Sequence, residues 1–284
     1  MAAARRRLAI MTVFLPRENL FFLDEWLRYH LAIGFGHVYL YDNSGSRFLD
    51  CGNNLEVTAR NKRGEAVYQL LAHLDDGAIA GELDRLLAPF ERRGLVTRIR
   101  WQPKDSAGRL TYGQVAAFID YIRRFRGESE WTCFTDLDEF VVPVRHDGML
   151  AVLDELARRN LTYVRMPQRC YGPRFDETGL PVRRVLDIVR CSDWLAPSFC
   201  SKAMVRNDTL RAPWFPRSYS IHAPDARGRK ADRLFDPDLL RFNHYKFNQW
   251  ELDWVATNLG YPLVLDREEH SMARFAPAMA ALPL

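Results

Sequence analysis

Cysteines are few in this sequence, and they follow no pattern that holds a metal or a disulfide framework. The five are Cys51, Cys133, Cys170, Cys191 and Cys200. Their number is odd, and no two of them form a C-x-x-C pair. Both features are typical of ordinary intracellular thiols, so we expect neither a zinc site built from cysteines nor a disulfide-stapled secreted domain.

A long apolar run is also missing, because no stretch approaches the roughly 20 apolar residues that span a bilayer. Three arginines at residues 5–7 precede the apolar residues 8–15, as in a signal peptide. That stretch is short and runs into Pro16-Arg17-Glu18 without a small-residue cleavage site, which favours a first strand. We therefore expect a cytoplasmic protein whose basic N-terminus is able to touch the anionic inner face of a membrane.

Neither of the two common nucleotide-binding loops is present. No G-x-G-x-x-G follows residues 8–15 and no Walker loop occurs, which argues against a dinucleotide cofactor and a P-loop mechanism. The net charge of +4 is slight for 284 residues, and the arginines are spread along the chain, which argues against a nucleic-acid binder. Scattered arginines do suit a phosphate-bearing ligand.

What the sequence does contain is an alternation of strands and helices. Residues 8–15 are typical of a buried parallel strand. Leucines at helical spacing follow Asn19, a candidate cap, and predict a helix that ends near Gly34. Residues 37–41 are the next predicted strand. A strand–helix–strand unit of this kind indicates an α/β fold.

The alternation continues to residue 145, after which prolines, aromatics and arginines dominate. Further helices are expected at residues 82–93, 112–126, 149–159 and 249–259, and strands at 95–101, 131–135, 163–166, 185–189, 199–205, 218–222 and 239–245. Residues 51–80 are expected to be an insertion, and the tail from Ser271 receives no role. Because there is no repeat or linker, we expect one domain over residues 1–284 with halves at 1–145 and 146–284.

Three carboxylates follow the strand predicted at residues 131–135, namely Asp136, Asp138 and Glu139. Ionised carboxylates are costly to bury unless they are paired or bind a cation. In an extended segment residues i and i+2 share a face, so Asp136 and Asp138 are able to hold one cation together while Leu137 packs behind them. A solvated acidic turn is the alternative interpretation.

Asp42 follows the strand predicted at residues 37–41 and is expected near the same place. Ligands of open α/β sheets bind beyond the carboxyl ends of the strands, and an acid after the second strand often contacts a ribose hydroxyl. A turn aspartate before Asn43-Ser44-Gly45 is the simpler alternative.

With these features in place, the chain resembles the GT-A glycosyltransferases of the family-2-like and family-92-like branch. The matching pieces lie at residues 24–30 with Gly34, 38–44, 94–96, Gln114, 131–143, 202–206 and 243–245. The chain departs from the branch at Asn19, where an acid is usual, at Asn248 and Gln249, where a Lys-Ser pair is common, and in the insertion.

The resemblance implies a GT-A-type α/β fold, with a mixed, mainly parallel sheet flanked by helices. Residues 1–145 would bind a nucleotide-sugar and residues 146–284 an acceptor. The implied reaction is metal-dependent transfer of a sugar from a nucleotide-diphosphate donor, a UDP-sugar, to a glycan or glycolipid acceptor in surface polysaccharide synthesis. Such an enzyme needs no nucleic-acid partner, and its oligomeric state stays open.

The resemblance also assigns roles to single residues. Asp136, Asp138 and His244 would hold Mn²⁺ or Mg²⁺, a choice that fits carboxylate and imidazole ligands. Taken alone, His244 is more simply a core or loop histidine. The donor-binding residues would be Leu15, Arg17, Asp42, Gln114, Asp136 and Lys202. If the reaction inverts the anomeric centre, Asp193 is our candidate for the general base, with Glu251 and Asp176 as rivals.

Other classes of protein share parts of this pattern. A sugar nucleotidyltransferase would normally carry a Gly-rich basic loop after its first strand, which Leu15-Pro16-Arg17-Glu18 is not. A phosphohydrolase with a D-x-D nucleophile would place it early in the chain. A catalytically silent nucleotide-sugar-binding module would keep the sheet, and the intact acids argue against it.

Overall fold

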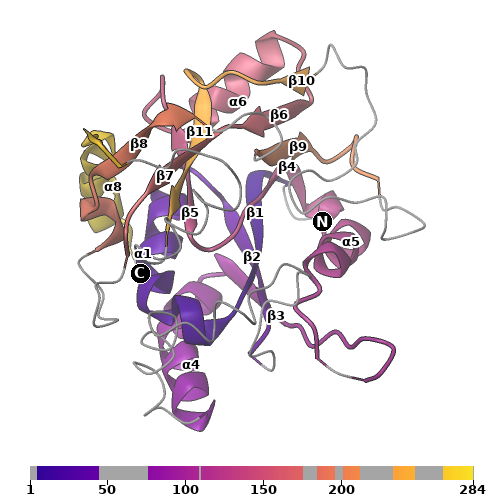
Figure 1. The fold of residues 1–284 in the computed structure, drawn as a ribbon. Helices are drawn as coiled ribbons and strands as arrows, with labels where there is room; N and C mark the ends of the chain where they lie inside the picture. Colours follow the sequence, from indigo (N-terminus) through magenta and orange to yellow (C-terminus); the bar gives the residue numbers. More distant parts are fainter. Residues whose placement is uncertain are drawn as a thin grey trace.

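The computed structural model describes residues 5–44, 76–108, 110–174, 184–195, 201–211, 233–246 and 265–283. Their strands form two sheets (Figure 1). The larger sheet contains β1 (Arg6–Phe14), β2 (His37–Asp42), β3 (Val96–Arg100), β4 (Ser129–Phe134), β6 (Tyr163–Met166), β9 (Lys202–Arg206) and β10 (Arg233–Leu234). The smaller contains β5 (Glu139–Pro143), β7 (Gln168–Tyr171), β8 (Arg190–Leu195), β11 (Leu240–Tyr245) and β12 (Arg267–Glu268).

Helices accompany both sheets. The α-helices are α1 (Pro16–Ala32), α4 (Asp76–Arg92), α5 (Gln114–Arg124), α6 (Met149–Arg158) and α8 (Ala276–Ala280), and the 3-10 helices are η1 (Arg126–Glu128), η2 (Val185–Asp187) and η6 (Ser271–Phe275). No helix in the described ranges is long and apolar enough to cross a membrane.

The larger sheet is mixed, in the order β10-β6-β9-β4-β1-β2-β3. Strands β2 and β4 both run parallel to β1, whereas β9 runs antiparallel to β4 and β6. An α/β fold with a mixed sheet is thus confirmed, and the GT-A assignment stays a proposal. The smaller sheet was not predicted.

Alternating residues of β1 build two cores on the two faces of the larger sheet. Leu8 and Ile10 belong to a cluster with the apolar residues of α1 and α4, while Ala9 and Met11 pack with those of α5. Figure 1 shows α5 on the opposite side of the sheet from α1 and α4. The cluster with α1 also includes Phe275, so one core joins both halves of the chain. The single domain itself stays a prediction.

Helix α1 holds the outer edge of strand β5 through three side chains. The indole Nε1 of Trp26 donates to the carbonyl of Glu139 (2.9 Å), and the Tyr29 hydroxyl donates to the carbonyl of Val141 (2.7 Å). The backbone N–H of Val141 donates to Nε2 of His30 (3.2 Å). Because β5 is an edge strand of the smaller sheet in the described residues, these side chains satisfy polar groups that a neighbouring strand would otherwise pair.

Three local expectations differ from the structure. Helix α1 begins at Pro16 with Leu15 as its cap, so Asn19 lies inside it and its side chain donates to the Leu15 carbonyl. Helix α4 begins at Asp76, inside the expected insertion. Residues 185–189, predicted as a strand, begin instead with η2, because the Glu25 carboxylate accepts the backbone N–H groups of residues 185 and 186.

The C-terminal tail is part of the core. The ring of Phe275 meets that of Tyr29 edge-on with centroids 5.4 Å apart, and Met272 is 2% exposed. The rest of the expected insertion, the strand at residues 218–222 and the helix at 249–259 lie outside the described residues.

Removing the Tyr29 hydroxyl is expected to destabilise the fold. Tyr29→Phe leaves the buried carbonyl of Val141 without its donor, which costs about 1–3 kcal/mol. Urea unfolding measures this loss. Tyr39→Phe is the matched control, because its hydroxyl donates to Glu128, whose side chain is 47% exposed and able to turn to water. Equal losses in the two variants would contradict the role of Tyr29.

Stability is also expected to fall in acid through His30. Burial lowers the pKa of His30 from 6.5 to about 3, and its Nε2 accepts a hydrogen bond that requires the neutral ring. Between these two pKa values the unfolded chain binds a proton at His30 and the folded chain does not. The contribution of neutral His30 to the free energy of unfolding is therefore complete above pH 6.5 and is lost as the pH falls toward 3.

The measurement is the slope of unfolding free energy against pH. His30→Asn should reduce that slope by about 1.4 kcal/mol per pH unit between about pH 4 and pH 6. His270→Asn, which removes an exposed histidine, is the matched control. A slope that is the same in His30→Asn and in the original chain would refute the assignment.

Candidate active site at the junction of the two sheets

The acidic triplet lies where the chain passes from the larger sheet to the smaller one. Strand β4 ends at Phe134, which is paired with Met11 of β1. Leu137 is 2% exposed and packs in the core, as expected. The backbone N–H of Glu139 donates to the carbonyl of Asp136 (3.2 Å), and β5 begins there. This turn aims the carboxylates of Asp136 and Asp138 at different partners.

Asp136 is engaged by two residues that were predicted to bind the donor. Lys202 Nζ lies 2.6 Å from its Oδ2, and Gln114 Nε2 donates to its Oδ1. Lys202 is 3% exposed, so its ammonium is inside the protein. Gly113 places Gln114 at the start of α5, since its φ of +58° favours glycine and a Cβ would lie 2.4 Å from a Pro103 side-chain carbon.

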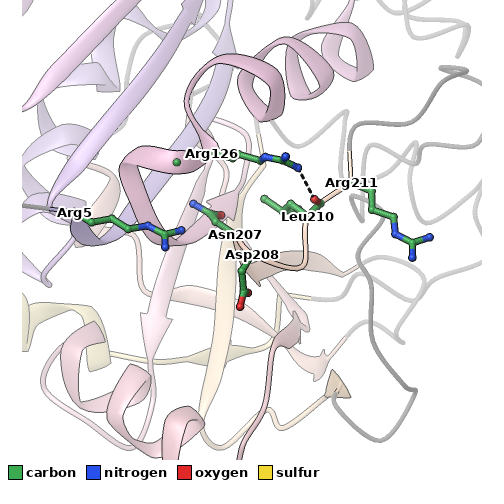
Figure 2. Close-up of a pocket in the computed structure, with 7 residues that line it drawn as sticks. Arg5, Arg126, Asn207, Asp208, Leu210 and Arg211 are labelled. Carbon is green, nitrogen blue, oxygen red and sulfur yellow. Dashed lines mark hydrogen bonds between the residues drawn. The ribbon is translucent and has the colours of Figure 1, made fainter. Parts of the chain in front are cut away.

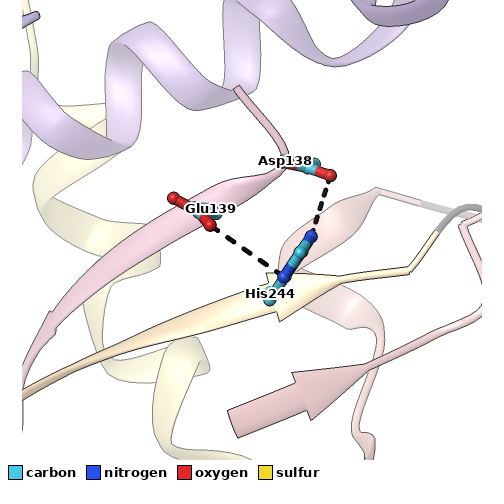
Figure 3. A group of neighbouring side chains, drawn as sticks. All are labelled: Asp138, Glu139 and His244. Atoms are coloured by element: carbon cyan, nitrogen blue, oxygen red, sulfur yellow. Dashed lines mark hydrogen bonds and ion pairs between the residues drawn. The ribbon is translucent and has the colours of Figure 1, made fainter. Parts of the chain in front are cut away.

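Asp138 faces His244, from a strand far away in the sequence. The pairing of β11 with β5 sets His244 opposite Glu139, and His244 Nε2 lies 3.0 Å from Asp138 Oδ2 (Figure 3). The other ring nitrogen, Nδ1, lies 2.9 Å from Gln168 Oε1 on β7. If Nδ1 donates to this amide oxygen, Nε2 is the ring nitrogen that would bind a cation beside Asp138, an arrangement common among metal-binding histidines.

Glu139 is the third carboxylate and is 1% exposed. Its Oε2 accepts the backbone N–H of Asp136 (2.9 Å) and lies 3.5 Å from Lys202 Nζ, and its Oε1 lies 3.9 Å from His244 Nδ1 (Figure 3). Burial raises the pKa of Glu139 well above its usual value, and the charges of Asp136 and Asp138 raise it further against the lowering effect of Lys202. A positive charge added nearby would therefore stabilise the ionised form of Glu139.

Basic side chains surround Asp138 on its other side. Lys246 Nζ lies 3.3 Å from His244 Nε2, and Arg174 Nη2 lies 4.0 Å from Asp138 Oδ2. Burial alone would raise the pKa of Asp138, but His244, Arg174 and Lys246 together hold it below its usual value. Gly172 allows the backbone of Lys246 to pack closely against it, since a Cβ at its φ of +145° would lie 3.0 Å from the Lys246 carbonyl oxygen.

Asp138, Glu139 and His244 have the chemistry of a site for a divalent cation. One ligand atom from each lies within 4.8 Å of the other two. Two carboxylates and an imidazole, without a thiolate, suit Mn²⁺ or Mg²⁺. The three predicted metal ligands are therefore only partly together: Asp138 and His244 meet, Glu139 joins them, and Asp136 is held by Lys202 and Gln114.

The remaining predicted donor residues flank the end of β1. Asp42 is 4% exposed and its Oδ2 lies 2.7 Å from Arg98 Nη2, so its carboxylate already has a partner. The Leu15 side chain is buried, and Arg17 lies in α1. Because β2 and β4 lie on either side of β1, Asp42 and the end of β4 are separated by more than two strand spacings, about 10 Å: Asp42 is level with Phe14 of β1, and the end of β4 with Met11.

The candidate bases are placed only in part. Asp193 belongs to β8, which lies between β12 and β7 in the smaller sheet, and its side chain is not among those that the structure describes. Glu251 and Asp176 lie outside the described residues.

Sequence reasoning missed Lys246 and Arg174 and left Glu139 without a role. Lys246 had a signal, because it stands two residues after His244 in an extended run and so shares its side of the strand. Arg174 and the supporting Gln168 had none, since only strand pairing brings them to the site.

Known proteins match most of this chain. A family model described as glycosyltransferase family 92 matches residues 73–275. A protein of Oryza sativa subsp. japonica named glycosyltransferase family 92 protein Os08g0121900 is 24% identical over 237 residues, which are 83% of this chain and 33% of the rice protein. Galactan beta-1,4-galactosyltransferase GALS1 of Arabidopsis thaliana is 28% identical over 129 residues, which are 42% of this chain and 25% of that protein.

The chain thus spans a third or less of the length of these plant proteins. A solved structure described as a mycobacterial protein aligns over 73% of this chain and 55% of its own at 11% identity. Its TM-score of 0.29 is too low to support a shared fold.

Removing Lys202 is expected to destabilise the protein strongly. Lys202→Met leaves two carboxylates inside the site without their cation, which costs about 3–5 kcal/mol. Adding Glu139→Gln should recover part of this loss, because it removes one of those charges. Urea unfolding with a chelator present measures both variants, and a double variant as unstable as the sum of the single ones would contradict the coupling.

Proposed function

Because the chain belongs to glycosyltransferase family 92, we propose that it is a GT-A-type enzyme that uses Mn²⁺ or Mg²⁺ to move a sugar from a UDP-sugar to a glycan or glycolipid acceptor. The observation that carries this proposal is the group of Asp138, Glu139 and His244, set among basic side chains at the carboxyl end of β4. Family membership supports glycosyl transfer, and this geometry supports a role for a cation and a diphosphate.

Asp138, Glu139 and His244 would hold the cation. When bound, it supplies a Lewis acid for the departing diphosphate. Gln168 fixes the His244 ring, and the Trp26 indole fixes the backbone of Glu139, so the ligands are held before any cation arrives.

The basic residues would bind the phosphates of the donor. Lys246 and Arg174 lie on the His244 side of Asp138, and Lys202 lies on the Asp136 side. Cations on both sides of a metal suit a diphosphate, whose charge exceeds that of one divalent ion. Asp136, kept in place by Lys202, would then contact the ribose.

The name of one relative bears on the acceptor and the donor sugar. The name of GALS1 describes galactosyl transfer to a polysaccharide, and it favours a hexose as the transferred sugar and a surface polysaccharide as the product. Asp193, on β8, stays our candidate for the base of an inverting reaction.

UDP and Mn²⁺ together are expected to raise the melting temperature more than either alone. A ligand at about 100 times its dissociation constant adds about 2.7 kcal/mol to the free energy of unfolding. Asp138→Asn should abolish this gain, since it removes a cation ligand. Asp154→Asn, at an exposed aspartate of α6 that pairs with Arg7, should retain it.

The proposal fails if no nucleoside diphosphate stabilises the protein with any divalent cation. Formation of a nucleotide-sugar from a nucleoside triphosphate, with release of diphosphate, would establish a nucleotidyltransferase instead. Transfer of a radiolabelled sugar from the donor to a glycan, lost in Asp138→Asn, would complete the assignment.

A further inference from the structure

A cavity lies at the end of the larger sheet that is opposite the acidic triplet. Its volume is about 750 Å³. Arginines supply much of its lining, which includes Arg5, Arg126 and Arg211 beside Asn207, Asp208 and Leu210 (Figure 2). Arg5 precedes β1, η1 contains Arg126, and the remaining residues follow β9.

This cavity is separate from the candidate active site. Strand β9 runs from Lys202, which pairs with Asp136, to Arg206, next to the cavity, and it spans about 13 Å. Strand β4 makes the same passage in the opposite direction. The cavity and the acidic triplet therefore lie at opposite ends of these two strands, and a ligand of the cavity is independent of the proposed function.

Two of the guanidinium groups are anchored in place by backbone carbonyls. Arg5 Nε donates to the carbonyl of Ser129 (2.7 Å), and Arg126 Nη1 donates to the carbonyl of Leu210 (2.9 Å; Figure 2). An arginine has further N–H donors besides the one used in such a bond. The anchors restrain both side chains, which reduces the entropy that a ligand must remove.

A buried hydrogen-bond network supports the surface between them. Asn207 Nδ2 donates to the Ser129 carbonyl and hydroxyl (both 2.9 Å), and its Oδ1 accepts from the Thr132 hydroxyl (2.8 Å). Asn207 is 2% exposed, so this network ties the end of β9 to β4. The cavity is therefore held by the sheet itself.

Arg5 and Arg126 have no carboxylate partner in the part of the chain that the structure describes. Two nearby arginines do: Arg6 pairs with Glu128 at 3.2 Å, and Arg206 pairs with Asp208 at 2.8 Å. The carboxylate in the lining is thus already neutralised, and two anchored cations remain to attract an anion.

We propose that this cavity binds a phosphate-bearing ligand. Guanidinium groups form forked hydrogen bonds with phosphate oxygens, and a phosphomonoester carries about 1.5 to 2 negative charges at neutral pH, which matches two arginines. The volume exceeds that of a bare phosphate and leaves room for the organic group that carries it. Such a ligand is either a soluble phosphomonoester or the headgroup of an anionic lipid.

Calorimetric titration with glycerol 3-phosphate tests the soluble source. A chelator is present to keep divalent cations out of the candidate active site. Flotation with phosphatidylcholine vesicles that contain or lack phosphatidic acid, whose headgroup is the same phosphomonoester, tests the lipid source. The full chain is used in both, and the melting temperature confirms that each variant is folded.

Arg5→Gln combined with Arg126→Gln is expected to weaken binding of the responding probe by about tenfold or more. Arg92→Gln combined with Arg93→Gln removes the same charge from an exposed site at the end of α4 and should leave binding unchanged. Asp138→Asn should also leave it unchanged. Arg126→Lys keeps the charge without the fork and should give a smaller loss.

Binding of glycerol 3-phosphate that depends on Arg5 and Arg126 supports the proposal with a soluble ligand. Binding of phosphatidic acid vesicles with the same dependence supports it with a lipid headgroup. The proposal is overturned if neither probe binds the original chain. It is also overturned if the double variant at Arg5 and Arg126 and the control double variant at Arg92 and Arg93 weaken binding equally.

Discussion

The candidate site depends on the hydrogen bonds between side chains of α1 and the edge of β5. An edge strand exposes backbone groups that must find partners, and here an indole, a phenol and an imidazole supply them. The contact to the Glu139 carbonyl falls on a residue of the acidic triplet itself. A helix from the first half of the chain therefore sets the position of carboxylates that begin the second sheet.

The second constraint is the balance of charge around those carboxylates. Glu139 is almost completely buried, and Asp136 and Asp138 lie beside it, so the three carboxylates repel one another. Lys202, His244, Lys246 and Arg174 compensate from three different strands and loops. Desolvation consumes much of what a buried ion pair gains in stability. Under the proposed function, these charges would exchange partners with a bound cation and diphosphate.

The larger sheet separates two regions of different chemistry. At the carboxyl ends of β1 and β4 lie carboxylates surrounded by basic side chains. At the opposite end of these strands lie arginines that donate to backbone carbonyls. Strand β9, antiparallel to its neighbours, contributes to both: Lys202 at its start and Asn207 just beyond its end. One short strand thus connects a candidate catalytic site with a candidate phosphate site, and its apolar middle keeps the two apart.

Much of the fold was accessible from local patterns, because periodicity and strand-ending acids are properties of neighbouring residues. The sequence alone determined the alternating first half, the packing of Leu137 behind the acids, and the candidacy of Asp136 and Asp138, whereas His244 became a candidate only through the resemblance to a known family. Tertiary structure alone decided how these residues are distributed: pairing of β11 with β5 set His244 against Asp138 and Glu139, while Lys202 and Gln114 took Asp136. Strand register across 106 residues depends on long-range packing and turn geometry, and no local window of sequence contains that information.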